Sequence, residues 1–348
     1  TTEDVPCTNE VISISYKKLP EEVKAGNHIF IADGLVDLVV EKALGNKIHC
    51  KVMNGAEIGS KKNVNVTGVK TSLPAITERD VADIVFAIEN GFDFIAASFI
   101  RKPQDVKEIQ DLLDHYDSKL GIISKIEDEE GVENIDEIIR VTSFGIMIAR
   151  GDLGVQLKTE DIPLVQKRII EKCNRENKPV ITATQMLDSM INNPKPTRAE
   201  ATDVANAIFD GTDAIMLSGE TASGKYPALA VQTMHNIALS VEKSKEYIEK
   251  CKSYIKLGSD GSSMSETISK AAFSIASDIK ASAIITPTTH GTTPKLISKY
   301  RPIQKIIAVT TSQEVQRKLL IFWGIYPILT DLVSDSDMMI NNALKSAI

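Results

Sequence analysis

Two carboxylates and one ammonium group follow apolar runs of the sequence, where together they could bind a divalent cation and a phosphate group. Lys125 and Glu127 are separated by one residue, so on a strand they project from the same face. Asp152 follows a second apolar run, which ends at Ala149. Mg²⁺ typically takes one or two protein carboxylates and leaves its other positions to water and substrate oxygens. An ammonium group beside such an ion offsets phosphoryl charge in a transition state.

Backbone and hydroxyl groups near these residues add to the predicted site. The N–H groups around Gly151 and Asp152 lead into a helical turn, where an anion binds well. Further polar side chains end two later apolar runs, and these are Thr182, Thr184, Ser218 and Glu220.

Each of these residues also has an ordinary structural interpretation. A lone Lys-x-Glu pair such as Lys125 and Glu127 is more often a solvated ion pair at a strand end. An isolated Gly-Asp such as that at Asp152 is more often a helix cap. Glu220 is also typical of the first turn of a helix. The prediction of a ligand site therefore depends on all of them meeting on one rim.

The elements that bring these residues together are predicted from apolar runs between residues 74 and 243. Runs begin near residues 94, 121, 145, 179 and 214, and amphipathic helical patterns such as 201–208 separate them. Serial strand–helix units of this kind build a parallel sheet. The carboxyl ends of its strands gather on one face, where barrels of this type carry their function. Five units are visible, so we expect an incomplete (βα)8 TIM barrel.

Residues 1–73 are expected to form a small antiparallel β domain. Alternating apolar and polar residues at 11–16, 28–34 and 47–53 are typical of antiparallel strands. The basic turn Gly59–Lys62 is more often a solvated loop, although it could meet a phosphate above the barrel mouth.

Residues 244–348 are expected to form a C-terminal α/β domain. Helical patterns at 264–279 and 314–322 alternate with strand patterns at 283–287, 305–310 and 325–329. The segment Thr286–Pro294 follows a strand and precedes a helix, so its hydroxyl and N–H groups form either an anion-binding nest or an ordinary capped loop.

The bulk composition excludes some classes of partner. Among 348 residues, 40 Lys and Arg against 47 Asp and Glu give a formal net charge of -7. This charge argues against nucleic acid or an anionic membrane as the main partner. The cysteines Cys7, Cys50, Cys173 and Cys251 lie far apart, which is typical of reduced thiols. We expect a cytoplasmic protein with neither a membrane span nor a signal peptide.

At these residues the sequence resembles the pyruvate kinase family, and the resemblance covers essentially the whole chain. It rests on long, specific motifs, which are Ile123–Gly131, Met147–Gly154, Lys178–Met190, Asn193–Glu200 and Met216–Ala222. The resemblance implies phosphoryl transfer from phosphoenolpyruvate to ADP, giving pyruvate and ATP at the end of glycolysis. It also implies a TIM barrel with an inserted β-barrel lid and a C-terminal regulatory domain.

The resemblance assigns roles to individual residues. Glu127 and Asp152 would ligate Mg²⁺ or Mn²⁺, and Lys125 would stabilise the transferring phosphoryl group and the enolate. Thr184 would lie where the enolate is protonated. The carboxylate pocket would be lined, chiefly by backbone, by Ala149, Arg150, Gly151 and Asp152. Other assigned residues are Lys62 at the nucleotide phosphates, Asp33 in a turn of the lid, and Ser218 and Glu220 as supporting groups.

The resemblance also implies regulation and assembly. The loop around Thr286, Thr288, Thr289, His290, Gly291, Thr292 and Thr293 resembles the phosphate grip of an allosteric sugar-phosphate site. A homotetramer is expected for the full-length protein.

Two family motifs that belong to the first three barrel strands do not occur in this sequence. They supply the K⁺ ligands and a phosphate-binding arginine, so the resemblance implies K⁺ with ligands outside this chain. The resemblance also implies that the end of the C-terminal domain lies outside this chain. A five-unit barrel would leave two open sheet edges, so this chain should not fold as a monomer. The alternatives are another metal-dependent TIM-barrel enzyme of phosphoenolpyruvate or pyruvate chemistry, or an inactive fragment that retains effector binding.

Overall fold

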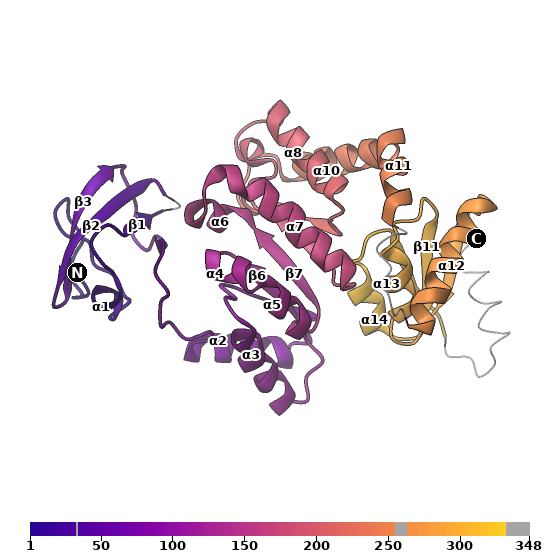
Figure 1. Ribbon diagram of the computed structural model, residues 1–348, viewed down its shortest axis with the longest axis horizontal. Coiled ribbons are helices and arrows are strands. Elements are labelled where there is room, and N and C mark those ends of the chain that lie inside the picture. Colours follow the sequence, from indigo (N-terminus) through magenta and orange to yellow (C-terminus); the bar gives the residue numbers. More distant parts are fainter. Residues whose placement is uncertain (33, 255–262, 332–348) are drawn as a thin grey trace.

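The computed structural model describes residues 1–32, 34–254 and 263–331. Asp33, one of the residues expected in the lid, lies outside this part of the chain, as does the end of the expected C-terminal domain. Figure 1 shows three units in a row, with the N-terminal β unit at one end and the C-terminal α/β unit at the other.

The N-terminal unit is a four-stranded antiparallel sheet in the order β3-β2-β1-β4. Its elements are helix α1 (Leu19–Glu22) and strands β1 (His28–Ile31), β2 (Val36–Leu44), β3 (Lys47–Asn54) and β4 (Val64–Val66). Leu19, Val23, Ile29 and Val40 form its buried core. We refer to this unit as the lid.

The alternating pattern predicts a strand at residues 11–16, and this prediction is wrong. That segment joins no sheet, and it contacts the first residue of the chain instead. The Thr1 ammonium donates a hydrogen bond to Ile12 O at 2.8 Å, and Ile14 N donates to Thr1 O at 2.9 Å. The alternation of apolar and polar residues therefore did not distinguish a strand paired in a sheet from an extended segment outside it.

The middle unit confirms the predicted serial strand–helix units. Its five strands are all parallel and lie in sequence order. They are β5 (Phe94–Ala97), β6 (Gly121–Ile126), β7 (Gly145–Ala149), β8 (Val180–Ala183) and β9 (Ala214–Ile215). Strands β5 and β9 are the edges of this sheet.

Helices connect and cover these strands (Figure 1). The α-helices are α2 (Glu78–Glu89), α3 (Pro103–His115), α4 (Glu129–Glu133), α5 (Ile135–Val141), α6 (Arg150–Gln156), α7 (Ile162–Arg175), α8 (Arg198–Asp210), α9 (Gly219–Ala222), α10 (Pro227–Glu242) and α11 (Lys245–Ser253). Two 3₁₀ helices lie at η1 (Thr159–Asp161) and η2 (Asp188–Ile191). The predicted capping box of α2 is present, because Thr77 Oγ1 accepts from Asp80 N while the Asp80 carboxylate accepts from Thr77 N.

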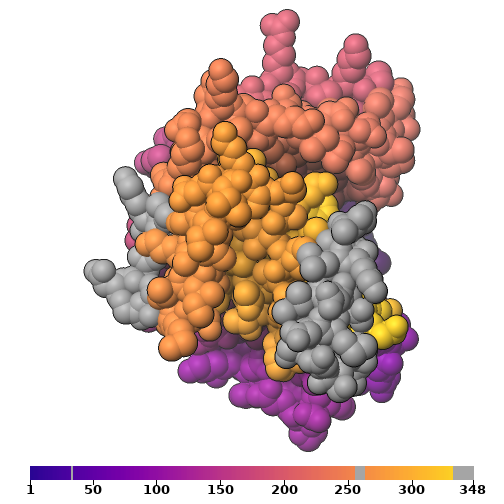
Figure 2. All heavy atoms as spheres, turned by 90° about the vertical axis from the view of Figure 1, so that its right-hand side faces the viewer, coloured from indigo at the N-terminus to yellow at the C-terminus, as the bar shows by residue number. Residues whose placement is uncertain are grey.

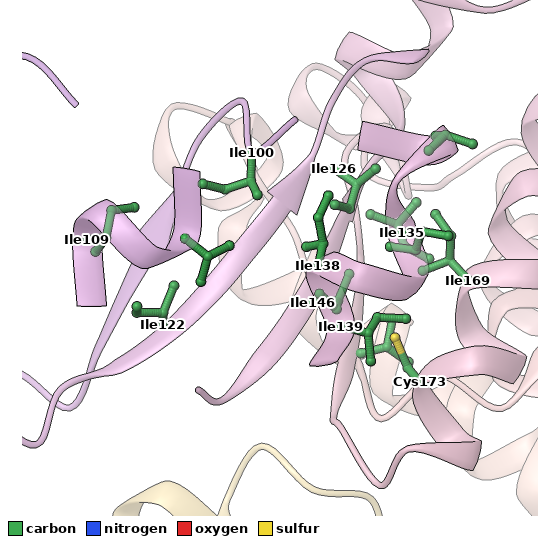
Figure 3. Packing of buried hydrophobic residues seen from close by; sticks show 14 of the residues in the cluster. Ile100, Ile109, Ile122, Ile126, Ile135, Ile138, Ile139, Ile146, Ile169 and Cys173 are labelled. Carbon is green, nitrogen blue, oxygen red and sulfur yellow. The ribbon is translucent and has the colours of Figure 1, made fainter. Parts of the chain in front are cut away.

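An isoleucine-rich core fixes β6 and β7 against their helices. Figure 3 shows side chains from the two strands meeting side chains from α3, α5 and α7. All residues of β7 are buried, as expected for a strand covered on both faces of a parallel sheet. The labelled members are Ile100, Ile109, Ile122, Ile126, Ile135, Ile138, Ile139, Ile146, Ile169 and Cys173. Because β6 and β7 carry Lys125 and the approach to Asp152, this core positions the predicted site.

The start of β7 has no space for a side chain. A Cβ atom on Gly145 would lie 2.6 Å from the carbonyl oxygen of Pro179, which is backbone and cannot rotate away. We expect Gly145→Ala to lower the free energy of unfolding by about 1–3 kcal/mol, as overpacked sites do. Chemical denaturation of the purified variant measures this loss.

Gly154→Ala is the matched control for Gly145→Ala. Gly154 lies in α6, and a Cβ added there meets nothing within 4 Å. Alanine favours helix over glycine, so the control should be neutral or slightly stabilising. Equal stability losses in both variants would contradict the assigned packing at the start of β7.

The C-terminal unit is a three-stranded parallel sheet in the order β10-β11-β12 with helices around it. Its elements are α12 (Met264–Asp278), β10 (Ala283–Pro287), α13 (Thr292–Ser298), β11 (Lys305–Thr310), α14 (Gln313–Leu319) and β12 (Ile325–Leu329). The three predicted strands are confirmed, and the predicted helix at 314–322 is shorter than expected. Figure 2 views this unit from its own end of the molecule.

A buried ion pair joins the C-terminal unit to the middle unit. Arg301 is 1% exposed and lies 2.8 Å from Asp213 Oδ1, and it donates to Gly211 O at 2.7 Å. The Asp213 carboxylate also accepts from Val180 N at the start of β8. In the part of the chain that the structure describes, no helix is long and apolar enough to cross a membrane.

Candidate active site

Two of the residues predicted for the rim, Lys125 and Glu127, form a close ion pair at the end of β6. Lys125 Nζ lies 2.7 Å from Glu127 Oε1, and the Glu127 residue is only 1% exposed. The Lys125 side chain keeps about a quarter of its surface exposed, at 24%. The pair at the strand end therefore consists of a buried carboxylate and a lysine side chain that is partly exposed to solvent.

The sequence interpretation missed two partners of this pair, Ser98 and Phe99. Lys125 Nζ donates to Ser98 Oγ at 2.9 Å, and Phe99 N donates to Glu127 Oε2 at 2.5 Å. Both residues follow β5, so the strand-end rule that identified the other rim residues could have found them. Phe99 has a φ of 51°, which is unusual for a bulky residue and aims its N–H at the carboxylate.

The end of β7 leads directly into α6, with Asp152 in the first turn of that helix. Ala149 is the N-cap, so Arg150 and Gly151 are the first two helical residues. Gly151 N donates to Thr184 Oγ1 at 2.6 Å. One of the N–H groups expected to bind an anion is therefore already used by a side chain from β8.

The Arg150 side chain is built into the protein rather than directed to a ligand. It lies 2.7 Å from Asp203 Oδ1 and donates to Thr184 O at 2.8 Å. It also donates to Gln166 Oε1 at 3.3 Å. The structure thus leaves only the backbone of Arg150 to line a substrate pocket, and it gives the side chain the task of holding the β8 loop.

The loop after β8 contains two strained residues in succession. Thr184 and Gln185 have φ values of 69° and 53°, and each such non-glycine residue costs about 1–3 kcal/mol. The Thr184 hydroxyl donates to Ala183 O and accepts from Gly151 N, each at 2.6 Å. Strain of this kind persists only where the surroundings hold it, and here it fixes the hydroxyl at the start of α6.

The Glu220 carboxylate connects two loops of the rim. It is 1% exposed, and its two oxygens accept from Leu187 N at 3.1 Å and from Ser218 N at 2.7 Å. The loops that follow β8 and β9 are therefore tied to one carboxylate. Thr182, by contrast, is fully buried and bonds Thr212 Oγ1 at 3.0 Å, so its hydroxyl does not reach the rim.

The donor set at the rim fits one class of metal ion. In residues 1–32, 34–254 and 263–331, no three His, Cys, Asp or Glu residues form a cluster able to hold a metal by themselves. Glu127 and Asp152, which follow the neighbouring strands β6 and β7, could supply two oxygen ligands. Such a set suits Mg²⁺ or Mn²⁺, which complete their shells with water and substrate, and does not suit a closed zinc site.

The turn after Glu127 adds negative charge near the ion pair. Burial raises the pKa of Asp128 to about 6, and the nearby Glu130 carboxylate also raises it. Asp128 Oδ1 accepts from Gly131 N at 2.8 Å and so begins α4. The Asp128 side chain therefore caps helix α4 and is not directed to the candidate metal site.

The lid lies against the same region. Its strand β4 contacts α6, and Lys62 is exposed on the loop that precedes β4. An open pocket of about 870 Å³ runs between the lid, the linker at residues 67–77 and β5. Its lining includes Tyr16, Val66, Leu73, Ser98, Arg101 and Gln156.

The C-terminal loop at Thr286–Thr293 is separate from the rim. Thr286 is buried and its hydroxyl donates to Ile307 O of β11 at 3.4 Å, while Thr288 Oγ1 accepts from Gly291 N within the loop at 2.9 Å. Gly291, with a φ of 78°, turns the chain into α13. The side chains exposed to a ligand are Thr289, His290, Thr292 and Thr293.

Comparisons with known proteins agree on one family. The model of the pyruvate kinase barrel domain matches residues 1–231, and that of the pyruvate kinase alpha/beta domain matches residues 266–348. A pyruvate kinase of Sporosarcina psychrophila is 50% identical over 345 residues, covering 98% of this chain and 58% of that protein. One of Clostridium acetobutylicum is 50% identical over 351 residues, covering 99% of this chain and 74% of that protein.

A solved structure supports the same relationship. The crystal structure of a pyruvate kinase from Cryptosporidium parvum superposes with a TM-score of 0.90 at 43% sequence identity. The match covers 96% of this chain and 69% of that one. The chain thus spans 58% of the length of some curated relatives that it matches.

Proposed function

The chain belongs to the pyruvate kinase family, and from that membership we propose that the protein transfers the phosphoryl group of phosphoenolpyruvate to ADP. The products are pyruvate and ATP. The observation that carries the proposal is the Lys125–Glu127 pair at 2.7 Å, on a rim that also presents Asp152 at the start of α6. An ammonium group beside carboxylates that could hold a divalent cation is an arrangement that stabilises the charge of phosphoryl transfer.

Lys125 would act where negative charge develops during transfer. A β-phosphate oxygen of ADP would form a bond to phosphorus while the bond between phosphorus and the enol oxygen of phosphoenolpyruvate breaks, and the electron pair of the broken bond would remain on the enolate oxygen of pyruvate. The Lys125 ammonium is held by Glu127 and by Ser98, so it needs no reorientation during the step. A preorganised charge of this kind lowers the barrier because it interacts more strongly with the transition state than with the substrate.

Glu127 and Asp152 would hold Mg²⁺ or Mn²⁺ at the rim. When bound, the ion supplies Lewis-acid neutralisation of phosphate and enolate oxygens. Glu127 is already oriented by the Phe99 N–H, so its carboxylate is fixed before any ligand arrives. A K⁺ requirement is part of the proposal by family membership, with its ligands outside this chain.

Thr184 would lie where carbon 3 of the enolate takes up a proton. Its hydroxyl is fixed between Ala183 O and Gly151 N at the start of α6. A hydroxyl can rotate its proton toward a new acceptor, so Thr184 can orient a water or the substrate there. The substrate carboxylate would lie beside the backbone of Ala149–Asp152, because the Arg150 side chain is engaged elsewhere.

Lid, effector and assembly complete the proposal. Residues 1–73 would close over the rim with Lys62 on the nucleotide phosphates, residues 74–243 would form the catalytic barrel, and residues 244–348 would form the regulatory domain. The exposed residues of the loop at Thr289–Thr293 would take the phosphate of a sugar-phosphate effector. The complete enzyme would be a cytoplasmic homotetramer.

A coupled assay tests the proposed function. Pyruvate released from phosphoenolpyruvate is reduced by lactate dehydrogenase, so NADH absorbance falls as pyruvate forms, and a fall that requires ADP reports transfer. We expect turnover in the complete native protein that needs Mg²⁺ or Mn²⁺ and stops on chelation. Absence of pyruvate formation with both substrates and the metal present would sink the proposal. Pyruvate formed equally well without ADP would instead favour another metal-dependent enzyme of phosphoenolpyruvate chemistry.

A further inference from the structure

The linker between the lid and the barrel is held from the lid side at Ser72. Its backbone N–H and its hydroxyl both donate to Glu22 Oε1, at 3.0 and 2.6 Å. Tyr16 OH donates to the same oxygen at 2.7 Å. Three donors therefore converge on one carboxylate oxygen of the lid, and they fix the middle residue of the segment Thr71–Leu73.

The same segment is held from the barrel side by Arg101. Its guanidinium donates to Thr71 O at 3.2 Å and to Leu73 O at 2.8 Å. These carbonyls flank Ser72, so the alternating contacts are those of an extended chain between two surfaces. The Arg101 side chain is only 11% exposed, and its Nε lies 3.5 Å from Asp105 Oδ2. Arg101 is thus a buried fork that binds the linker backbone.

Arg101 belongs to the short loop that also orients the ion pair. Ser98 contacts Lys125, and the Phe99 N–H contacts Glu127. Between these residues and Arg101 stands Ile100, which is 1% exposed and whose N–H donates to Lys125 O at 3.3 Å. Asn134 Nδ2 holds the Arg101 carbonyl at 2.9 Å. The loop after β5 therefore faces the rim with its first two residues and the lid linker with its fourth.

We propose that Arg101 is a positioning residue that couples the lid linker to the Lys125–Glu127 pair. The proposal rests on the proposed function, because it assigns lid position a role at the metal-binding carboxylate. The physical basis is that the loop from Ser98 to Arg101 is short and that Ile100 within it is buried. A shift of the linker carbonyls moves the Arg101 guanidinium. Because Ile100 is tightly packed, the loop transmits that shift to Phe99. Lid position and the orientation of Glu127 are thereby linked.

A purely structural role for Arg101 predicts something different. Loss of a buried arginine that only stabilises the fold would raise amide exchange across the whole barrel and lower stability. Coupling predicts changes confined to the linker and to the rim. The readouts must therefore resolve segments of the chain and must measure metal binding separately from activity.

The experiment compares variants of the complete native protein by hydrogen exchange and by Mn²⁺ affinity from electron paramagnetic resonance. Arg101→Gln removes the fork, and Arg101→Lys keeps the charge without the two divergent donors. Glu22→Ala frees Ser72 from the lid while leaving the barrel side of the linker intact. Arg79→Gln is the matched control, because the Arg79 side chain is 91% exposed and its contact with Asp83 is 3.9 Å.

Arg101→Gln should speed exchange at residues 71–73 and 98–101 by about tenfold or more, since charged hydrogen bonds are lost. It should also weaken Mn²⁺ binding several-fold and raise the KM for ADP more than it lowers kcat. Arg101→Lys should recover part of each effect. Glu22→Ala should speed linker exchange with Mn²⁺ affinity unchanged, and Arg79→Gln should change neither.

Two results would overturn the coupling. One is faster exchange throughout the barrel in Arg101→Gln, which would assign Arg101 to stability alone. The other is a loosened linker in Arg101→Gln with Mn²⁺ affinity equal to that of the wild type. Exchange and Mn²⁺ binding decide the coupling without turnover. A wild-type protein that fails the coupled assay would therefore overturn the proposed function and leave the coupling to be judged by these two readouts.

Discussion

Lys125→Met is expected to reduce turnover by about 10²–10³-fold, the usual cost of losing one preorganised electrostatic group. Methionine occupies a similar volume without the charge, so packing at the end of β6 should survive. Glu127 loses the cation at 2.7 Å but keeps its hydrogen bond from Phe99 N. Its carboxylate is then free of a competing positive charge. Mn²⁺ affinity should therefore stay equal to wild type or increase, while kcat collapses.

Steady-state kinetics and Mn²⁺ titration on the same preparations separate these two effects. Lys70→Met is the matched control, because the Lys70 side chain is 74% exposed and its nearest carboxylate contacts are 3.9 and 4.0 Å. That variant should keep normal turnover, since exposed pairs contribute little. Near-normal turnover in Lys125→Met would show that Lys125 does not take part in the reaction. A large loss of Mn²⁺ affinity would mean that Lys125 organises the site rather than stabilising the transition state.

The parallel sheet and most of the rim could be predicted from the sequence. Strands buried on both faces are short apolar runs, and helices between them repeat an apolar face every third or fourth residue. These patterns are local, so the runs beginning near 94, 121, 145, 179 and 214 identified β5–β9. The strand-end rule then located Lys125, Glu127 and Asp152 without any knowledge of packing.

What the sequence did not show depends on contacts between distant segments. The hydrogen bond from Phe99 to Glu127 joins residues 28 apart, and that from Lys125 to Ser98 joins residues 27 apart. The strand-end rule could have placed Ser98 and Phe99 on the rim, but no local pattern encodes which residues they contact. The left-handed φ of Thr184 is equally hidden, because threonine carries no signal for it as glycine does. The partner of the Arg150 side chain is hidden for the same reason, because Asp203 lies on a helix 53 residues further along the chain.

Glu127→Gln is expected to weaken Mn²⁺ binding by at least about tenfold and to lower turnover with it, because the affinity of an oxygen-ligand site follows its charge count. The amide keeps the size of the side chain, and its oxygen can still accept from Phe99 N. Its NH₂ group would then face the Lys125 ammonium, which also loses its carboxylate partner at 2.7 Å. The ion would thus meet one protein carboxylate and an uncompensated cation. Turnover should recover in part at high Mn²⁺ concentration, unlike that of Lys125→Met.

Glu130→Gln separates ligation from the general loss of negative charge near the rim. Glu130 lies three residues further on, in α4, and its contact with Lys70 is 3.9 Å. Removing its charge should change Mn²⁺ affinity by less than about twofold, because a partly exposed charge is screened. If Glu127→Gln and Glu130→Gln weakened Mn²⁺ equally, the ion would be responding to the field of the turn. Glu127 would then not be a metal ligand, and the divalent site would have to lie elsewhere on the rim.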